Sequence, residues 1–200
     1  MIIFVLFEES GKVRDAFRAA GHEAWSVDIL PTRGDPTYHI RKDIWEILGW
    51  VESVADAVIA FPPCTRLCVS GNRYHAGTPG RQKALKDIRR LMAMKVPHIA
   101  IENPVGVISS EIRKPDQTIQ PYQFGHPESK RTCLWLKGLP PLVPTEILPL
   151  PQTGRWSNQT PSGQNKLGPG PDRARLRAET YSGIAQAMAD QWGPVITARS

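Results

Sequence analysis

Short apolar runs alternate along this chain with segments of helical periodicity. Five runs are rich in β-branched and aromatic residues and have the length of buried strands: residues 2–7, 23–30, 55–61, 97–104 and 132–137. After the first run, Val13, Phe17 and Ala20 recur at the spacing of one helix face. The same periodicity returns in residues 81–95 and 179–193. Strands that alternate with helices predict one α/β domain with a mostly parallel sheet and helices on both faces.

Polar residues gather where the predicted strands end. In chain order these ends are Phe7 to Gly11, Asp28, Pro62-Pro63-Cys64 and Glu102-Asn103. In open parallel sheets the ligand binds at the carboxyl ends of the strands. We therefore expect the chemistry of this protein at one edge of the sheet.

The first of these turns lacks a G-x-G-x-x-G fingerprint, because Glu9 and Lys12 stand where glycines are expected. A diphosphate is not expected there, since acids repel phosphate, whereas a cationic ligand is compatible with them. Asp28 follows about 20 residues later in the sequence, the spacing at which an acid accepts hydrogen bonds from ribose hydroxyls in nucleotide-binding folds. An ordinary turn and a solvated carboxylate are the alternatives, and both stay open.

Cys64 follows two prolines and precedes a polar segment that contains a glycine, in FPPCTRLCVSG. Proline restricts the backbone, which favours a thiol held in one place where a planar ring can approach. A free thiol has a pKa of ~8.5 and becomes more nucleophilic when a neighbouring cation lowers that value. Arg66 is such a cation nearby in sequence. A cysteine that merely packs in the core is the alternative.

Glu102 closes the fourth predicted strand and would lie beside the Cys64 strand if the two are neighbours in the sheet. Partial burial would raise its pKa and let it donate a proton to a ring nitrogen. A helix cap or an ion pair is the alternative for this carboxylate. Lys130 and Arg131, just before the last predicted strand, are candidates for holding an anionic substrate.

A zinc site is a further alternative. Cys64, Cys68 and His75 could begin one, with Cys133 or His126 completing it. The C-x3-C spacing is permissible for zinc, but the second ligand pair that structural zinc sites usually contain is missing. We therefore expect no metal.

The composition limits the classes that remain. The 200 residues suit one domain, and a formal charge of +6 favours an anionic partner such as a nucleic acid or nucleotide. Three cysteines favour a reducing compartment. No apolar stretch has the length of a membrane span or the pattern of a signal peptide, so we expect a cytoplasmic protein that does not bind membranes.

Five segments together resemble the cytosine-C5 DNA methyltransferases, especially the short members that phages and prophages carry. They are VLFEESGKVRDAFRAAGHEAWSVD, ADAVIAFPPCTRLCVSG, IAIENPVG, FGHPESKRTCLWL and ETYSGIAQAMADQWG. The resemblance implies a Rossmann-like methyltransferase fold that binds S-adenosylmethionine. The positions that match the cofactor motifs of the family are Phe7, Gly11, Asp28, Asp43, Pro62 and Ser182.

The resemblance also implies a reaction. The thiolate of Cys64 would attack C6 of cytosine, Glu102 would protonate N3, C5 would take the methyl group, and a base would then remove the C5 proton. Lys130 and Arg131 match, with a shift, the arginines of a further catalytic motif. The substrate-binding positions implied in this way are Pro63, Thr65, Arg66, Ser70 and Asn103.

The chain departs from the family beyond the catalytic core. Residues 1–137 match the core, residues 138–178 form a Pro/Gly-rich basic loop in place of a target-recognition domain, and residues 179–200 are expected to form a helix packed on the core. This loop offers cations and one ring for stacking on a base: Arg155, Trp156, Lys166, Arg173, Arg175 and Arg177. DNA read with low sequence specificity, a single strand and a free cytosine nucleotide all remain open as substrates. A catalytically inactive relative that binds nucleic acid is the non-enzymatic alternative.

Overall fold

The structure is a computed structural model that describes residues 1–162, 165–167 and 173–198. Within these residues one seven-stranded sheet has the order β3-β2-β1-β4-β5-β7-β6. The strands are β1 (Ile2–Leu6), β2 (Glu23–Asp28), β3 (His39–Arg41), β4 (Ala57–Ala60), β5 (His98–Pro104), β6 (Gln117–Ile119) and β7 (Thr132–Lys137). The pairs between β1, β2, β3, β4 and β5 are parallel, and β7 runs antiparallel to both of its neighbours, β5 and β6. The predicted mostly parallel α/β sheet is therefore confirmed. The sequence pattern missed β3 and β6, which are too short to show a period.

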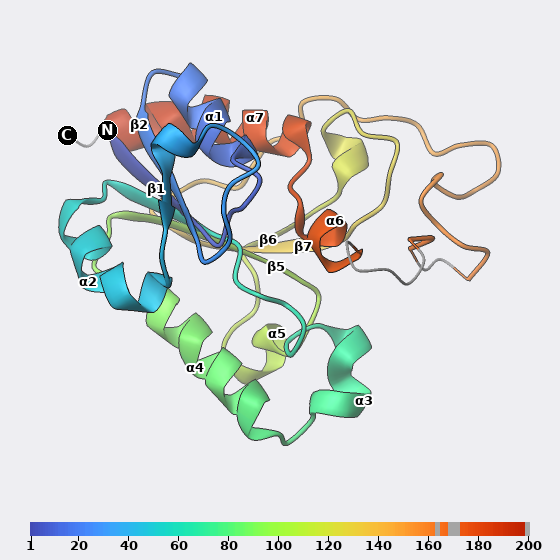
Figure 1. Ribbon diagram of the computed structural model, residues 1–200. Helices are drawn as coiled ribbons and strands as arrows, with labels where there is room; N and C mark the ends of the chain where they lie inside the picture. The colour runs from blue at the N-terminus through green and yellow to red at the C-terminus, as the bar shows by residue number, and fades with distance from the viewer. Residues whose placement is uncertain (163–164, 168–172, 199–200) are drawn as a thin grey trace.

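Helices cover both faces of the sheet, as predicted (Figure 1). They are α1 (Lys12–Ala19), α2 (Ile44–Val54), α3 (Asn72–His75), α4 (Pro79–Met92), α5 (Ile108–Glu111), α6 (Arg173–Ala178) and α7 (Ser182–Thr197). In β1, Ile3 and Val5 face the core beneath α1 and α7, whereas Phe4 and Leu6 face the core formed with α2 and α4. Burial on both faces explains why this strand is apolar at every position.

The carboxyl ends of β1, β4 and β5 lie side by side. The register pairs Leu6 with Ala60 and Ala60 with Ile101. The residues immediately after Leu6, Ala60 and Ile101 therefore lie at the same level of the sheet. They are Phe7, Phe61 and Glu102. The strand order also reverses beside β1, because β2 lies on one side of it and β4 on the other. Such a reversal opens the crevice in which α/β sheets bind their ligands.

The segment after β7 is extended but tied to the core. Leu139 and Leu142 are buried, and the indole of Trp192 in α7 donates a hydrogen bond to Pro140 O at 2.9 Å. Further along, the backbone amide of Glu146 donates to Gln123 O. The division of the chain at residues 137 and 178 stays a prediction. Of the helices that the structure describes, none combines the length and apolar character needed to cross a bilayer.

Candidate active site

Cys64 occupies a tight turn beyond the end of β4. Its carbonyl oxygen accepts hydrogen bonds from the amides of Leu67 and Cys68, both at 2.9 Å. Pro62 is buried, and Cys64 itself is partly exposed. The turn therefore presents the thiol at the carboxyl edge of the sheet instead of packing it in the core.

The turn is attached to the end of β5. The side-chain amide of Asn103 donates to Pro62 O at 2.8 Å, and the amide of Val107 donates to Leu67 O at 2.8 Å. Gly106 lies so close to Leu67 O that a Cβ there would collide with it. Asn103 is buried and supports the turn, and its predicted contact with substrate stays a prediction.

Glu102 is the only carboxylate among the pocket residues described below. Burial raises the pKa of its carboxyl group, while the charge of Lys130 and a hydrogen bond from the Thr132 hydroxyl act in the opposite direction. A raised pKa keeps more of this carboxyl group protonated near neutral pH, as a proton donor requires.

The charge of Glu102 also affects the pKa of the Cys64 thiol. Burial raises its pKa, and Cys68 and Glu102 raise it further, whereas Lys130 and Arg177 lower it. Arg66 does not take the activating role expected of it, because its guanidinium group lies over Gly80 in α4. Cys64 and Glu102 are thus coupled electrostatically, and the cations beside the thiol are Lys130, just before β7, and Arg177 of α6.

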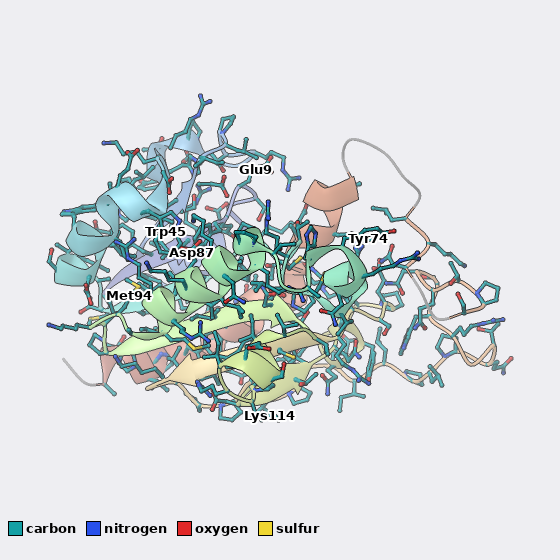
Figure 2. The ribbon with its side chains drawn as sticks, turned by 90° about the horizontal axis from the view of Figure 1, so that it is seen from below. Glu9, Trp45, Tyr74, Asp87, Met94 and Lys114 are labelled. Atoms are coloured by element: carbon teal, nitrogen blue, oxygen red, sulfur yellow. The ribbon has the colours of Figure 1, made fainter. Side chains whose placement is uncertain are left out.

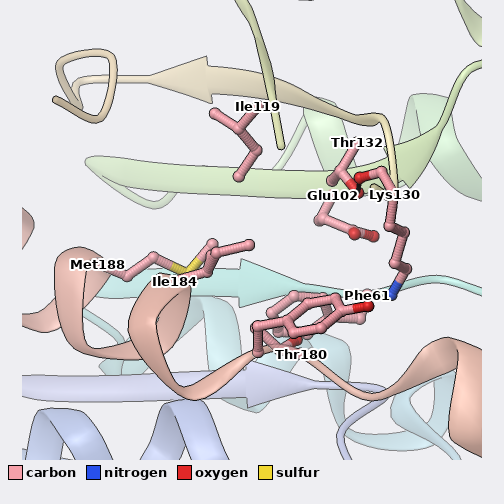
Figure 3. A pocket seen from close by; sticks show the side chains of 9 residues that line it. Phe61, Glu102, Ile119, Lys130, Thr132, Thr180, Ile184 and Met188 are labelled. Carbon is pink, nitrogen blue, oxygen red and sulfur yellow. Dashed lines mark hydrogen bonds between the residues drawn. The ribbon is translucent and has the colours of Figure 1, made fainter. Parts of the chain in front are cut away.

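A pocket lies between Glu102 and Lys130 on one side and α7 on the other, and Cys64 is not among the residues that line it (Figure 3). Its lining residues are Phe61, Glu102, Ile119, Lys130, Thr132, Thr180, Tyr181, Ile184 and Met188. Glu102, Thr132 and Lys130 form its polar side, while Ile119, Ile184 and Met188 are apolar. The free space holds about one water molecule, so a larger ligand needs the wall to move.

The wall of the pocket formed by Thr180 and Tyr181 is held by polar contacts. The hydroxyl of Tyr181 donates to Glu128 at 2.5 Å, and burial together with this carboxylate raises the pKa of the phenol. The amine of Lys130 donates to Glu179 O at 3.3 Å. Sequence reasoning missed Tyr181 and Thr180 because they lie far along the chain from the Cys64 and Glu102 motifs.

Ion pairs join this wall to the first turn. Glu179 contacts Lys12 Nζ at 2.5 Å and Arg33 Nη2 at 2.8 Å, and Arg33 Nε also contacts Glu9 at 3.1 Å. Although burial alone would raise it, the two hydrogen bonds from Lys12 and Arg33 hold the pKa of Glu179 below its usual value. The segment before α7 is therefore attached across the crevice beside β1.

The first turn is capped by its own acid. Glu8 is buried, and its carboxylate accepts hydrogen bonds from the amides of Val13 at 2.7 Å and Arg14 at 3.3 Å. Burial raises its pKa to about 7. These amides at the start of α1 are thus already used, and the turn does not offer them to an anion. Phe7, with φ 60°, and Gly11, with φ 76°, give the turn its left-handed bends.

The other predicted cofactor residues lie at separate points of the same edge. One oxygen of Asp28 accepts from the amide of Leu30 at 2.9 Å. Asp43 is exposed and caps α2 through the amide of Trp45 at 3.0 Å. Ser182 is exposed at the first position of α7.

Several predicted substrate residues do not line the pocket. Pro63, Thr65, Arg66 and Arg131 have exposed side chains, whereas the neighbour of Arg131, Lys130, points into the pocket. The side chains of Ser70, Arg173 and Arg175 lie outside the described residues, as do residues 163–164 and 168–172 of the predicted basic loop.

The predicted stacking role of Trp156 is wrong. Its side chain is buried, and its ring already stacks on Tyr122 with centroids 4.9 Å apart and planes 8° apart. A buried ring that is stacked on a partner offers no open face to a base. Among the residues that the structure describes, no group of three or more His, Cys, Asp or Glu is placed to hold a metal ion.

Comparison with protein-family models gives no match, and comparison with curated proteins gives none either. Among solved structures, the chain is similar to an Escherichia coli protein described as a prophage-encoded DNA modification methyltransferase. The identity is 17%, the match covers 75% of this chain and 52% of that one, and the TM-score is 0.49.

Two Dnmt2 structures are also similar. The Dnmt2 methyltransferase of S. pombe is 21% identical, over 68% of this chain and 50% of that one, with a TM-score of 0.49. A mutant of Spodoptera frugiperda DNMT2 is 18% identical, over 79% and 57%, with a TM-score of 0.40. The chain spans about half the length of the structures it matches. At these values the likeness assigns neither an activity nor a substrate to this chain.

Proposed function

We propose that this protein is a methyltransferase that uses S-adenosylmethionine to methylate C5 of cytosine in DNA. One observation carries the proposal: a partly exposed thiol and a carboxyl group with a raised pKa lie at the ends of adjacent parallel strands and are coupled to each other and to Lys130. Attack on a pyrimidine needs a nucleophile for C6 and a proton for N3, and this pair supplies both.

The residues of this chain take separate parts in the reaction. Cys64 Sγ, as a thiolate, forms a bond to C6, and the proton of Glu102 moves to N3, so that electron density builds at C5. Burial raises the pKa of Cys64, and the charges of Lys130 and Arg177 act in the opposite direction, in favour of the thiolate. After C5 has gained a methyl group, a base from the solvent takes the C5 proton, the Sγ–C6 bond breaks to release the thiolate, and the N3 proton returns to Glu102.

The edge around β2 fits the nucleoside part of the proposed cofactor. Asp28 supplies a carboxylate for ribose hydroxyls, and the next two side chains, Ile29 and Leu30, are 65% and 50% exposed and apolar, as a flat base requires. Phe7 and Trp45 lie nearby, with ring centroids 6.0 Å apart. Bound there, S-adenosylmethionine would supply an electrophilic methyl group.

Methyl transfer from a labelled donor tests the proposal. Duplex DNA, single-stranded DNA and free dCMP are offered to the wild type and to Cys64→Ser. We expect label in DNA with the wild type and none with Cys64→Ser. Label in dCMP alone would remove DNA as the substrate, and label in none of the three would contradict the enzymatic proposal.

A further inference from the structure

Two apolar side chains are exposed on the segment that follows Cys64. Tyr74 in α3 is 73% exposed and Val69, just before α3, is 60% exposed. Figure 2 shows Tyr74 and Met94 toward opposite ends of α4, so Tyr74 lies far from the amino edge of the sheet, where β5 begins. Tyr74 follows Cys64 by ten residues in the chain. Its exposed ring is available for stacking, which the ring of Trp156 is not.

The charge around this ring suits a polyanion. Between Asp56 and Asp87 the sequence contains no acidic residue. Arg66 and Arg73 are exposed on the same segment, and the guanidinium of Arg73 lies 5.9 Å from the centroid of the Tyr74 ring. A cation next to an open aromatic face can bind a phosphate while the ring binds a base.

The segment is held in position. Arg81 of α4 is buried, and it donates to Arg66 O at 2.8 Å and to the side chain of Asn72 at 2.5 Å. The amide of Val69 donates to Val105 O at 3.2 Å, beyond the end of β5. The surface is therefore attached to α4 and to the residues that follow β5, the strand that carries Glu102, and it need not be ordered by a ligand.

We propose that Arg66, Val69, Arg73 and Tyr74, the α3 surface, bind a single strand of nucleic acid beside Cys64, with Tyr74 stacked on a base. A single strand is favoured because stacking needs a base face that duplex stacking has not already covered. α3 is only one turn long, too short to read a major groove as recognition helices do. The inference rests on the proposed function for its choice of nucleic acid.

Fluorescence anisotropy with labelled oligothymidine tests the α3 surface without methyl transfer, because this probe contains no cytosine. Three probes are compared: single-stranded oligothymidine, single-stranded oligouridine of the same length, and the oligothymidine–oligoadenine duplex. The variants are Tyr74→Ala, Tyr74→Phe, Arg73→Ala and, as a control at the opposite edge of the sheet, Lys95→Ala, whose side chain is exposed before β5 begins.

We expect the wild type to bind either single strand more tightly than the duplex. Tyr74→Ala should weaken single-strand binding about tenfold, while Tyr74→Phe keeps it within about twofold, because the ring carries the stacking. Arg73→Ala should lower the salt dependence by about one phosphate contact, and Lys95→Ala should leave it unchanged.

Equal binding by Tyr74→Ala and the wild type, or tighter binding to the duplex, would overturn the inference. Its failure is distinguishable from that of the proposed function. Binding that depends on Tyr74 without methylation of any cytosine-containing substrate would leave the α3 surface standing and remove the methyltransferase. Methylation of cytosine by a Tyr74→Ala variant that binds single strands as tightly as the wild type would leave the methyltransferase standing and remove the α3 surface.

Discussion

The side-chain amide of Asn103 donates a 2.8 Å hydrogen bond to the carbonyl oxygen of Pro62, and this bond joins the end of β5 to the turn that presents Cys64. Asn103 is buried, so its contribution is to hold two catalytic candidates at a fixed separation.

Asn103→Leu should reduce both stability and methyl transfer. The change leaves Pro62 O without its donor, which costs ~1–3 kcal/mol of unfolding free energy. Gln117→Met is the control. Gln117 lies on the edge strand β6, and its side-chain amide donates to Leu142 O and accepts from the amide of Leu142. Urea unfolding should show similar losses for both variants, and activity should fall only in Asn103→Leu. Equal activities would remove the positioning role.

Glu102→Gln should keep cofactor affinity and lose most of the turnover. Glutamine has nearly the same shape but cannot donate the N3 proton, and general acids contribute roughly 10²–10⁴-fold to rates. Calorimetry measures the affinity and labelled methyl transfer the rate. A near-normal rate would show that the proton comes from another group.

A covalent adduct should accumulate on Cys64 with 5-fluorocytosine substrates. Fluorine at C5 cannot leave as a proton, so the Sγ–C6 bond persists after methyl transfer. Mass spectrometry should find the adduct in the wild type and in Cys68→Ser, and not in Cys64→Ser. Normal methylation of cytosine without any adduct from the fluorinated base would exclude the covalent route.

Glu8 should make the protein less stable as the pH rises. Its folded-state pKa is about 7, above the usual 4.5, so the folded state binds the proton more tightly than the unfolded state does. This stabilisation is complete below the pKa that Glu8 has in the unfolded state. It is lost as the pH rises through the pKa of Glu8 in the folded state, by ~3 kcal/mol in total.

Glu8→Gln should remove this part of the pH dependence. The two proteins are compared by urea unfolding between about pH 5 and about pH 8, and their difference isolates Glu8 from Glu102, whose pKa is also raised. Parallel stability curves for the two proteins would contradict the prediction.

In the Glu179→Gln variant, the pocket wall formed by Thr180 and Tyr181 should open more often than in the wild type. Its ion pairs with Lys12 and Arg33 hold the segment that carries Thr180 and Tyr181, and partly exposed pairs contribute up to ~1 kcal/mol each. Hydrogen exchange at residues 180–183 should accelerate severalfold in the variant, and added salt should have the same effect on the wild type. Asp190→Asn, on the exposed side of α7, should exchange like the wild type.

How far the site could be predicted is seen in Lys130 and Arg131. The sequence places both before β7, but only Lys130 reaches the pocket, because neighbouring side chains of an extended chain point in opposite directions. Glu8 is a second case. Its place in the first turn predicts an acid that faces a cationic ligand, yet its carboxylate turns back onto the amides of α1.

The sequence by itself determined the α/β architecture and the edge at which Cys64, Glu102 and Asp28 emerge. Both follow from local patterns, since apolar runs become strands and the polar residues after them must lie at strand ends. Only the tertiary structure decided that Trp156 stacks on Tyr122, that Tyr181 closes the pocket and that Tyr74 stays open. Each of these outcomes depends on whether a segment distant in the chain covers the ring, and no local pattern contains that information.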